Sequence, residues 1–383
     1  MKKTLAAVAV LGAFAGSALA ADVQLYGIVD LGVGYNHVDV DGLGDKQDID
    51  KFEMKNGQAS GSRWGIKGTE DLGNGLTVGF ILEDGFDADT GSEDKTKVMF
   101  NRESSLFIEG SFGKFAMGRI GSINNGQSSW AKAGMISAFG TSDWGGYSAQ
   151  IGNVMHMAGQ WDNMIAYQTP DFAGFKVYAQ YGMGTNDNEN ESRSDRYYAL
   201  GATYNNGPFA GYFAVDSINY QTADLTAGVD ADDIDDSLTV TLGGSYDFDV
   251  VKVYLGAQYF DEVKLSKFSG VLGDAGVVKA GTSDYKVKGY AVTLSGDAPL
   301  WGGKAMFGIG YTDADTADSE EDVKDVELSR YVVSVGYDYP FSKRTDVYAV
   351  ASYMQDSWEN NGTTKVDADP SAYTLYVGLR HRF

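Results

Sequence analysis

The chain of 383 residues contains three histidines and no cysteine, so few of its side chains are suited to catalysis. Without cysteine there is no disulfide, no thiolate nucleophile and no zinc–thiolate site. The histidines (His37, His156 and His381) do not stand in H-E-x-x-H spacing, and no G-x-S-x-G, Walker or dinucleotide-binding motif occurs. His156 is the sole candidate base for a hydrolase on this chain. We therefore predict that the protein is not an enzyme and has no cofactor.

Carboxylates offer the other possible chemistry, because they gather in two acidic stretches, 230–236 and 313–327. Neither stretch has the glycine and terminal glutamate of an EF-hand loop. The simpler interpretation is two solvated loops, and the alternative is weak Ca²⁺ or Mg²⁺ binding that bridges to anionic surface lipid. The formal net charge of −23 disfavours nucleic acid as a partner, because phosphates are neutralised by Lys and Arg.

The first twenty residues have the pattern of a secretory signal peptide. Lys2 and Lys3 precede an apolar stretch from Leu5 to Phe14, and the small residues Ala18 and Ala20 mark a cleavage site. The apolar stretch is shorter than the ~20 residues that a membrane-spanning helix needs. We predict a signal peptide at 1–20 and one mature domain at 21–383. No apolar run long enough for a transmembrane helix follows.

Most of the mature chain alternates between apolar and polar or small residues, which is the period of a β-strand. The last twelve residues, 372–383, show it clearly, and 23–35 mirrors them. Asn-Gly steps such as Asn74-Gly75 separate alternating runs, as in β-hairpins. Fifty glycines and 24 tyrosines are consistent with strands, tight turns and aromatic residues at a membrane interface.

Short and long connections also alternate along the chain. Seven short turns lie near 71–75, 111–114, 170–174, 205–208, 247–249, 296–303 and 338–345. Eight longer loops lie near 37–59, 85–99, 121–158, 183–194, 217–237, 260–284, 312–327 and 355–371. The fifteen connections join sixteen strands, with all long loops on one side, which is typical of an outer-membrane barrel. The five prolines are all expected in connections, because a closed barrel has no edge strand to tolerate a missing N–H.

Several motifs, in this order, resemble the Gram-negative general porins of the neisserial and β-proteobacterial type. They are VQLYGIVDLGV at 23–33, SRWGIKGTEDLGNGL at 62–76, FNRESSLFIEGSFG at 100–113, AMGR at 116–119, YQTPDFAGF at 167–175 and the terminal Phe383. The resemblance implies an all-β fold, a sixteen-stranded antiparallel transmembrane barrel, assembled as a homotrimer in the outer membrane. It also implies that the third long loop, 121–158, folds into the lumen, and that the final strand is recognised by the outer-membrane insertion machinery.

The resemblance further implies a pore constriction, in which acidic loop residues face basic residues on the wall. Arg63 and Arg102 match the basic wall. Side chains at odd and even positions of a strand face opposite sides (the parity of the strand), and this independently predicts that Arg63 faces the lumen. Asp143 is the acidic candidate of the loop, with Asp162 as a second.

Two positions depart from the family pattern and deplete the basic wall. Ile28 and Gln160 stand where many relatives have Lys and Arg. Asp30 and Glu83 project inward by parity, so we expect a preference for cations.

The favoured function is passive diffusion of ions and small hydrophilic solutes through a water-filled pore in the outer membrane of a Gram-negative bacterium. The expected partners are outer-membrane lipid, the passing solutes, two further copies of the chain and the insertion machinery. A sugar-selective channel or a loop-mediated adhesin on the same barrel remains the alternative.

Overall fold

The computed structural model describes residues 22–40, 48–95, 98–184, 194–220, 235–264, 271–272, 286–317, 326–360 and 366–383. The predicted signal peptide lies outside this part of the chain. The sixteen barrel strands are β1 (Asp22–Asp39), β3 (Arg63–Gly73), β4 (Leu76–Asp87), β6 (Glu103–Gly110), β7 (Gly113–Gly121), β8 (Gln160–Gln168), β9 (Phe175–Gly182), β10 (Arg196–Asn206), β11 (Phe209–Asn219), β12 (Leu238–Asp247), β13 (Lys252–Lys264), β14 (Lys286–Leu300), β15 (Gly303–Thr316), β16 (Val326–Pro340), β17 (Thr345–Asn360) and β19 (Ser371–Arg382). The other described strands are β2 (Ile49–Asn56), β5 (Ser92–Glu93) and β18 (Val366–Ala368).

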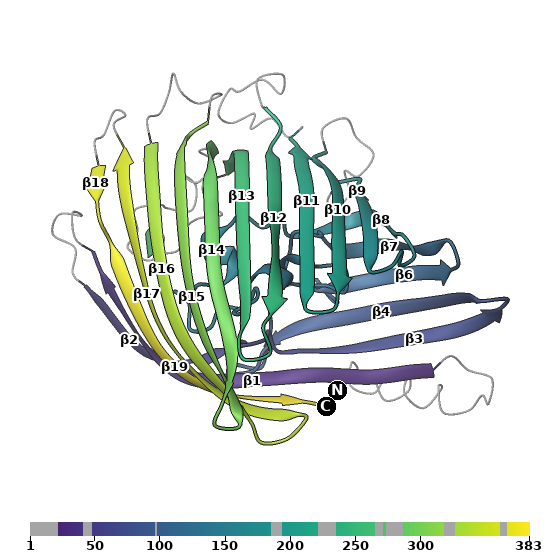
Figure 1. The fold of residues 1–383 in the computed structure, drawn as a ribbon, viewed down its shortest axis with the longest axis horizontal. Coiled ribbons are helices and arrows are strands. Elements are labelled where there is room, and N and C mark those ends of the chain that lie inside the picture. Colours follow the sequence, from purple (N-terminus) through teal and green to yellow (C-terminus); the bar gives the residue numbers. More distant parts are fainter. Residues whose placement is uncertain are drawn as a thin grey trace.

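The sixteen barrel strands pair into a closed antiparallel ring (Figure 1). Each pairs with its neighbour in sequence, and the ring closes where β1 pairs with β19 from Ile28↔Arg382 to Asp39↔Ser371. The terminal Phe383 extends this seam, because its N–H donates to the Gly27 carbonyl and its carbonyl accepts from the Gly27 N–H. Because the ring is closed, no strand edge is left with unpaired N–H and C=O groups. Such an edge would be unfavourable within the hydrocarbon core of a membrane. The predicted sixteen-stranded fold is confirmed.

The outer face of the barrel is apolar and the inner face is polar. Large exposed apolar side chains alternate with buried polar ones, as at Leu375 and Val377 beside Thr374 on β19. Exposed aromatic residues gather near both ends of the strands: Tyr198, Tyr259, Tyr290, Tyr331, Tyr353 and Tyr373 toward the long loops, and Phe175, Phe209, Tyr246, Tyr339 and Phe383 toward the short turns. Two aromatic belts around an apolar band are the surface that a lipid bilayer requires.

The structure corrects two details predicted from the sequence. The expected loop 37–59 contains β2, which pairs with the second half of β1 while β3 pairs with the first half. Acidic residues at the ends of this segment obscured its alternation. The expectation that every proline lies in a connection is wrong for Pro299 and Pro340, which belong to β14 and β16. Both stand within two residues of the strand end, where few ladder hydrogen bonds remain to be lost.

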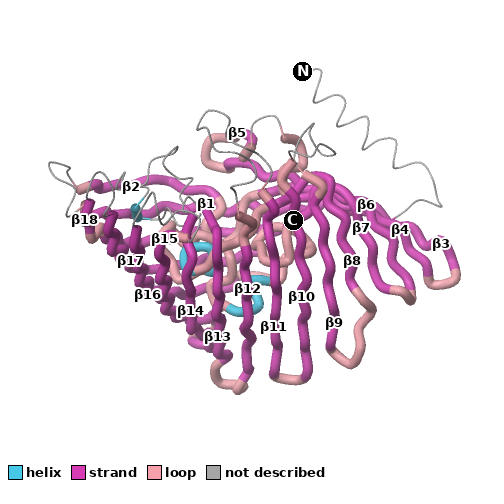
Figure 2. Tube along the Cα trace, turned by 90° about the horizontal axis from the view of Figure 1, so that it is seen from above, coloured by secondary structure: helices cyan, strands magenta, loops and turns pink. Residues whose placement is uncertain are grey.

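The segment from Ser122 to Gly159 joins β7 to β8 and contains two short helices, η2 (Ala133–Ile136) and α2 (Ile151–Val154) (Figure 2). Its apolar residues are buried, including Trp130, Ile136, Phe139 and Val154. Inward-facing polar residues of four strands bind its backbone: Gln258 to His156, Ser295 to Ala138, Thr312 to Val154 and Ser334 to Ala149. The segment is therefore tied to the wall formed by β13 to β16.

Candidate functional site

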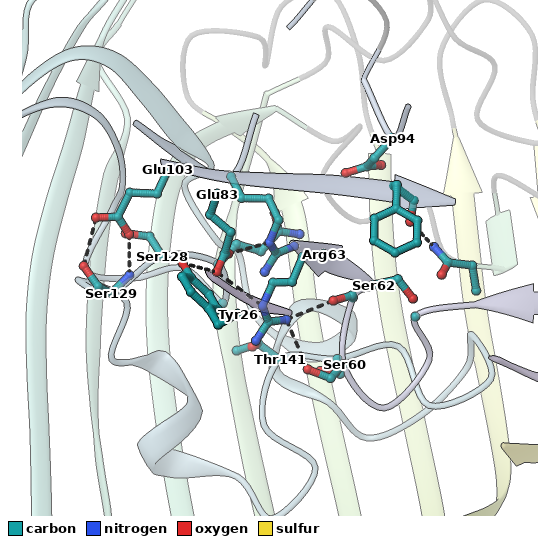
Figure 3. Close-up of a pocket in the computed structure, with 18 of the residues that line it drawn as sticks. Tyr26, Ser60, Ser62, Arg63, Glu83, Asp94, Glu103, Ser128, Ser129 and Thr141 are labelled. Atoms are coloured by element: carbon teal, nitrogen blue, oxygen red, sulfur yellow. Dashed lines mark hydrogen bonds and ion pairs between the residues drawn. The ribbon is translucent and has the colours of Figure 1, made fainter. Parts of the chain in front are cut away.

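A polar cavity of about 570 Å³ lies between the strands β1 to β6 and the segment 122–159 (Figure 3). Its lining is dominated by charged and hydroxyl side chains rather than by apolar ones. The charged residues that line it are Arg63, Lys67, Glu83, Asp87, Asp94, Arg102, Glu103 and Asp143. Such a site suits hydrated ions and polar solutes better than an apolar ligand.

Glu83 lies at the centre of the charged cluster, between two arginines. Its Oε1 accepts a hydrogen bond of 2.7 Å from Arg102 Nε, and its Oε2 lies 3.4 Å from Arg63 Nε. The Tyr26 hydroxyl donates to the same carboxylate at 3.0 Å. One carboxylate thus neutralises part of two positive charges while holding both side chains in place.

Strand register explains how these residues meet. Tyr26, Gly65, Glu83 and Glu103 are successive cross-strand partners on β1, β3, β4 and β6. Gly65 has no side chain, and a Cβ there would come within 2.7 Å of the Tyr26 ring. The glycine therefore lets the tyrosine ring lie across β3 and reach Glu83.

A turn after β2 shapes the wall beside Arg63. Asp30 on β1 is completely buried, and its carboxylate accepts from the N–H groups of Ala59 and Ser60 at 2.9 and 2.7 Å. The Tyr348 hydroxyl donates to it at 2.6 Å. The turn then presents the Ser60 hydroxyl and the Gly61 carbonyl to Arg63 Nη1.

Asp143 enters the cavity from the segment 122–159. Its side chain is exposed to the cavity and makes no hydrogen bond or ion pair with the residues that the structure describes. The surrounding protein limits the hydration of this carboxyl and so raises its pKa above the ordinary value, and the nearby charge of Lys55 partly opposes that rise. Among the described residues, the carboxylate of Asp143 therefore has no oppositely charged group bound to it.

Four of the six predicted constriction residues meet in this cavity: Arg63, Glu83, Arg102 and Asp143. Asp30 and Gln160 are not among the residues that line it. Asp30 holds the turn after β2, and Gln160 donates a hydrogen bond to Gln127, which itself lines the cavity. Their part in a constriction stays a prediction.

The structure adds charged residues that were not singled out from the sequence. Lys67 shares the parity of Arg63 on β3 and could have been inferred. Glu103 begins β6 and is the cross-strand partner of Glu83, a register that the sequence alone does not give. Asp87 and Asp94 lie in the region that was interpreted as a loop, where parity gives no guidance.

Metal binding finds no support in the part of the chain that is described. No group of three His, Asp or Glu side chains is placed there to hold an ion. The acidic stretches 230–236 and 313–327 lie largely outside the described residues, so weak Ca²⁺ or Mg²⁺ binding stays a prediction. No described helix is long and apolar enough to cross a membrane.

A closed barrel with an apolar belt outside and a charged cavity inside defines the class of membrane channels built from β-strands. Comparison with known proteins narrows this class. The family model for Gram-negative porins matches residues 6–359. The chain is 34% identical to an outer membrane porin protein of Bordetella pertussis and 27% identical to the major outer membrane protein P.IB of Neisseria gonorrhoeae, in both cases over 100% of each chain.

Among solved structures, the anion-selective porin from Comamonas acidovorans matches with a TM-score of 0.68 at 24% identity, over 95% of this chain and 100% of that one. This likeness concerns the fold. The protein belongs to the Gram-negative porin family and is an outer-membrane porin. The resemblance inferred from the sequence motifs is thus confirmed.

Proposed function

We propose that the protein mediates passive diffusion of ions and small hydrophilic solutes down their gradients, with a preference for cations. The observation that carries this proposal is the charged, water-accessible cavity within a closed barrel. Its relatives are named as porins, and this chain is likewise proposed to be a channel rather than an enzyme.

We further propose that the segment 122–159 folds into the lumen and forms one side of the constriction. Its hydrogen bonds to inward-facing residues on β13 to β16 support this, as does the position of Asp143 in the cavity lining. On the opposite side lie Arg63 and Arg102, which Glu83 holds. The narrowest part of the pore would therefore lie between Asp143 and this pair of arginines.

The sign of the selectivity follows from the charges that line the cavity. Five acidic side chains (Glu83, Asp87, Asp94, Glu103 and Asp143) face three basic ones (Arg63, Lys67 and Arg102). A low-dielectric wall focuses the field of this excess on the passing ion. The Comamonas porin is anion-selective. At 24% identity, however, its likeness to this chain concerns the fold and gives no information on the charges that line the cavity.

Replacing Asp143 by asparagine is expected to lower the permeability ratio of K⁺ to Cl⁻ by roughly a factor of two, because an exposed charge is partly screened by salt. The ratio is obtained from the reversal potential of the purified protein in a planar bilayer under a KCl gradient. The pKa of Asp143 is raised, so acidification should neutralise this carboxylate at a higher pH than an ordinary one. The wild-type preference should therefore weaken on acidification more than that of the variant. An anion preference in the wild-type protein would refute the proposed sign.

We also propose that three copies assemble in the membrane, each with its own pore. An apolar groove on the outer face of the barrel runs across β1, β16, β17 and β19, beside Phe52 of β2. This groove supports a contact with another copy of the chain. Its side chains include Val33, Val335, Leu375 and Val377. Closures in groups of three, in the same bilayer recordings, would support the trimer.

The final strand is proposed to be the segment that the outer-membrane insertion machinery recognises. Deleting Phe383 is expected to reduce the amount of folded protein in the outer membrane several-fold, because the deletion removes the terminal aromatic ring and the last hydrogen bonds of the closing seam with Gly27. The measurement is the heat-modifiable folded fraction in isolated outer membranes.

The substitution Phe383→Tyr, which keeps the ring and the backbone, serves as the control. Equal assembly of the deletion variant and the wild-type protein would argue against recognition through this residue. Refolding of the same deletion variant into detergent separates a defect of the seam from a defect of recognition.

A further inference from the structure

Three lysines from separate parts of the chain face one region on the inner side of the barrel, near the short turns. Lys114 and Tyr178 are both cross-strand partners of Gln168, and the Tyr178 ring contacts Lys132. Lys114 belongs to β7 and shares its face with the buried Ala116. Lys176 belongs to β9 and shares its face with the buried Tyr178. Lys132 reaches the same place from the segment 122–159, and all three side chains are half-buried.

Aromatic rings and a carbonyl hold two of these lysines. Lys114 Nζ lies 3.9 Å from the ring centre of Phe107 and 5.6 Å from that of Trp130. Lys132 Nζ donates to the Ser129 carbonyl at 2.9 Å and lies 5.6 Å from the ring centre of Tyr178. The contacts orient the ammonium groups, but a cation–π contact does not cancel their charge.

Three carboxylates, Glu103, Glu109 and Asp171, partly offset the charge of this cluster. Among the described residues, neither Lys114 nor Lys132 forms an ion pair, and Lys176 lies 3.9 Å from Asp171. Glu103 acts on Lys114 and Lys132 from a distance. Its oxygens are already engaged with the Ser105 hydroxyl and with the N–H and hydroxyl of Ser129, at 2.8 to 2.9 Å.

These surroundings disfavour the charged form of Lys132. Burial, followed by the positive charges of Lys114 and Lys176, lowers the pKa of Lys132 to about 8, and the charge of Glu103 opposes this only in part. Glu109, the direct cross-strand partner of Lys114, acts on that lysine more strongly than Glu103 does. A bound anion would relieve the repulsion among the three ammonium groups, because each would gain an opposite charge nearby.

We propose that Lys114, Lys132 and Lys176 form a binding site for a small dianionic oxyanion of the sulfate or phosphate class. Each ammonium group supplies hydrogen-bond donors to the oxygens of the anion. None of the three lysines lines the acidic cavity, but the site adjoins it, because Ser129, whose carbonyl binds Lys132, lines that cavity. The pore therefore combines an acidic constriction with a basic anion site nearer the short turns.

The test is calorimetric titration of the purified folded protein with sodium sulfate, at constant ionic strength against sodium chloride. Sulfate keeps both negative charges over the relevant pH range, so any change of affinity with pH results from protonation of the protein. We expect saturable binding, weakened roughly tenfold in Lys132→Met, because a hydrogen bond between charged groups contributes about that factor. Lys132→Arg should retain binding. Because calorimetry does not require a conducting pore, its outcome is independent of the proposed channel function.

Lys252 provides the matched control, because its Nζ lies 5.1 Å from the Tyr254 ring on β13 without neighbouring lysines of this cluster. Lys252→Met should leave sulfate binding unchanged. Raising the pH from one unit below to one unit above the Lys132 pKa of about 8 should weaken binding in the wild-type protein and not in Lys132→Arg. Absence of saturable binding, or equal weakening by Lys252→Met and Lys132→Met, would overturn the proposal.

Discussion

Replacing Asp356 by alanine is expected to destabilise the barrel by roughly 3–5 kcal/mol, because the change leaves a buried arginine without its carboxylate. Arg330 and Asp356 are direct cross-strand partners on β16 and β17, and both are almost completely buried. Arg330 Nε and Nη2 donate to the two carboxylate oxygens at 2.6 and 2.7 Å. The bidentate geometry makes this the strongest type of ion pair.

The same arginine connects the wall to the segment 122–159. Its Nη1 donates to the Asn153 carbonyl at 3.1 Å, within helix α2. Losing Asp356 should therefore loosen α2 as well as the wall, and single-channel recordings of Asp356→Ala should show more frequent current fluctuations. Stability is measured by urea-induced unfolding of the protein in detergent or lipid.

Two comparisons make this prediction specific. Asp162→Ala removes a more exposed ion pair with Arg119 and should cost at most about 1 kcal/mol. Replacing both partners, as in Arg330→Met combined with Asp356→Leu, should restore most of the lost stability, because no buried charge is then left unpaired. A cost for Asp356→Ala no greater than that for Asp162→Ala would contradict the argument.

The alternation of residue types was sufficient to predict the barrel because each strand has one face toward lipid and one toward the lumen. The same parity placed Arg63 and Glu83 inward, and both line the cavity. Parity gives the face of a side chain but not what covers it. Asp30 faces inward as predicted, yet the turn after β2 folds over it. Two N–H groups of this turn donate to Oδ2 of the carboxylate, and the Tyr348 hydroxyl donates to Oδ1.

Register and irregularities account for the remaining differences. The pairing of Arg330 with Asp356 requires the exact offset of two strands, which their patterns alone leave open. Gln160 pairs with Gly121, next to a register shift between β7 and β8 that falls between Ile120 and Gly118, and across this shift parity no longer predicts the direction of a side chain. Local alternation therefore predicts the wall, while contacts between distant segments decide which inward residues meet the solvent.

Replacing Glu83 by glutamine is expected to have the largest effect on selectivity. The amide still accepts a hydrogen bond, but the negative charge between Arg63 and Arg102 is lost. Both guanidinium groups then act on the cavity without a neutralising partner, and the excess of acidic lining residues falls from two to one. We expect the permeability ratio of K⁺ to Cl⁻ to fall by about tenfold, because charges in a low-dielectric cleft change local ion concentrations by at least that factor.

Glu70→Gln is the matched control, since Glu70 lies on the same strand as Arg63 but has the opposite parity and is exposed. Its reversal potential should match that of the wild-type protein. High salt should shrink the difference between Glu83→Gln and the wild-type protein, because the effect is electrostatic. If both variants had the same reversal potential, the arginines would have to be neutralised by something other than Glu83. The cluster of Glu83 with its two arginines would then be structural, and selectivity would depend on Asp143 and the remaining acidic residues of the lining.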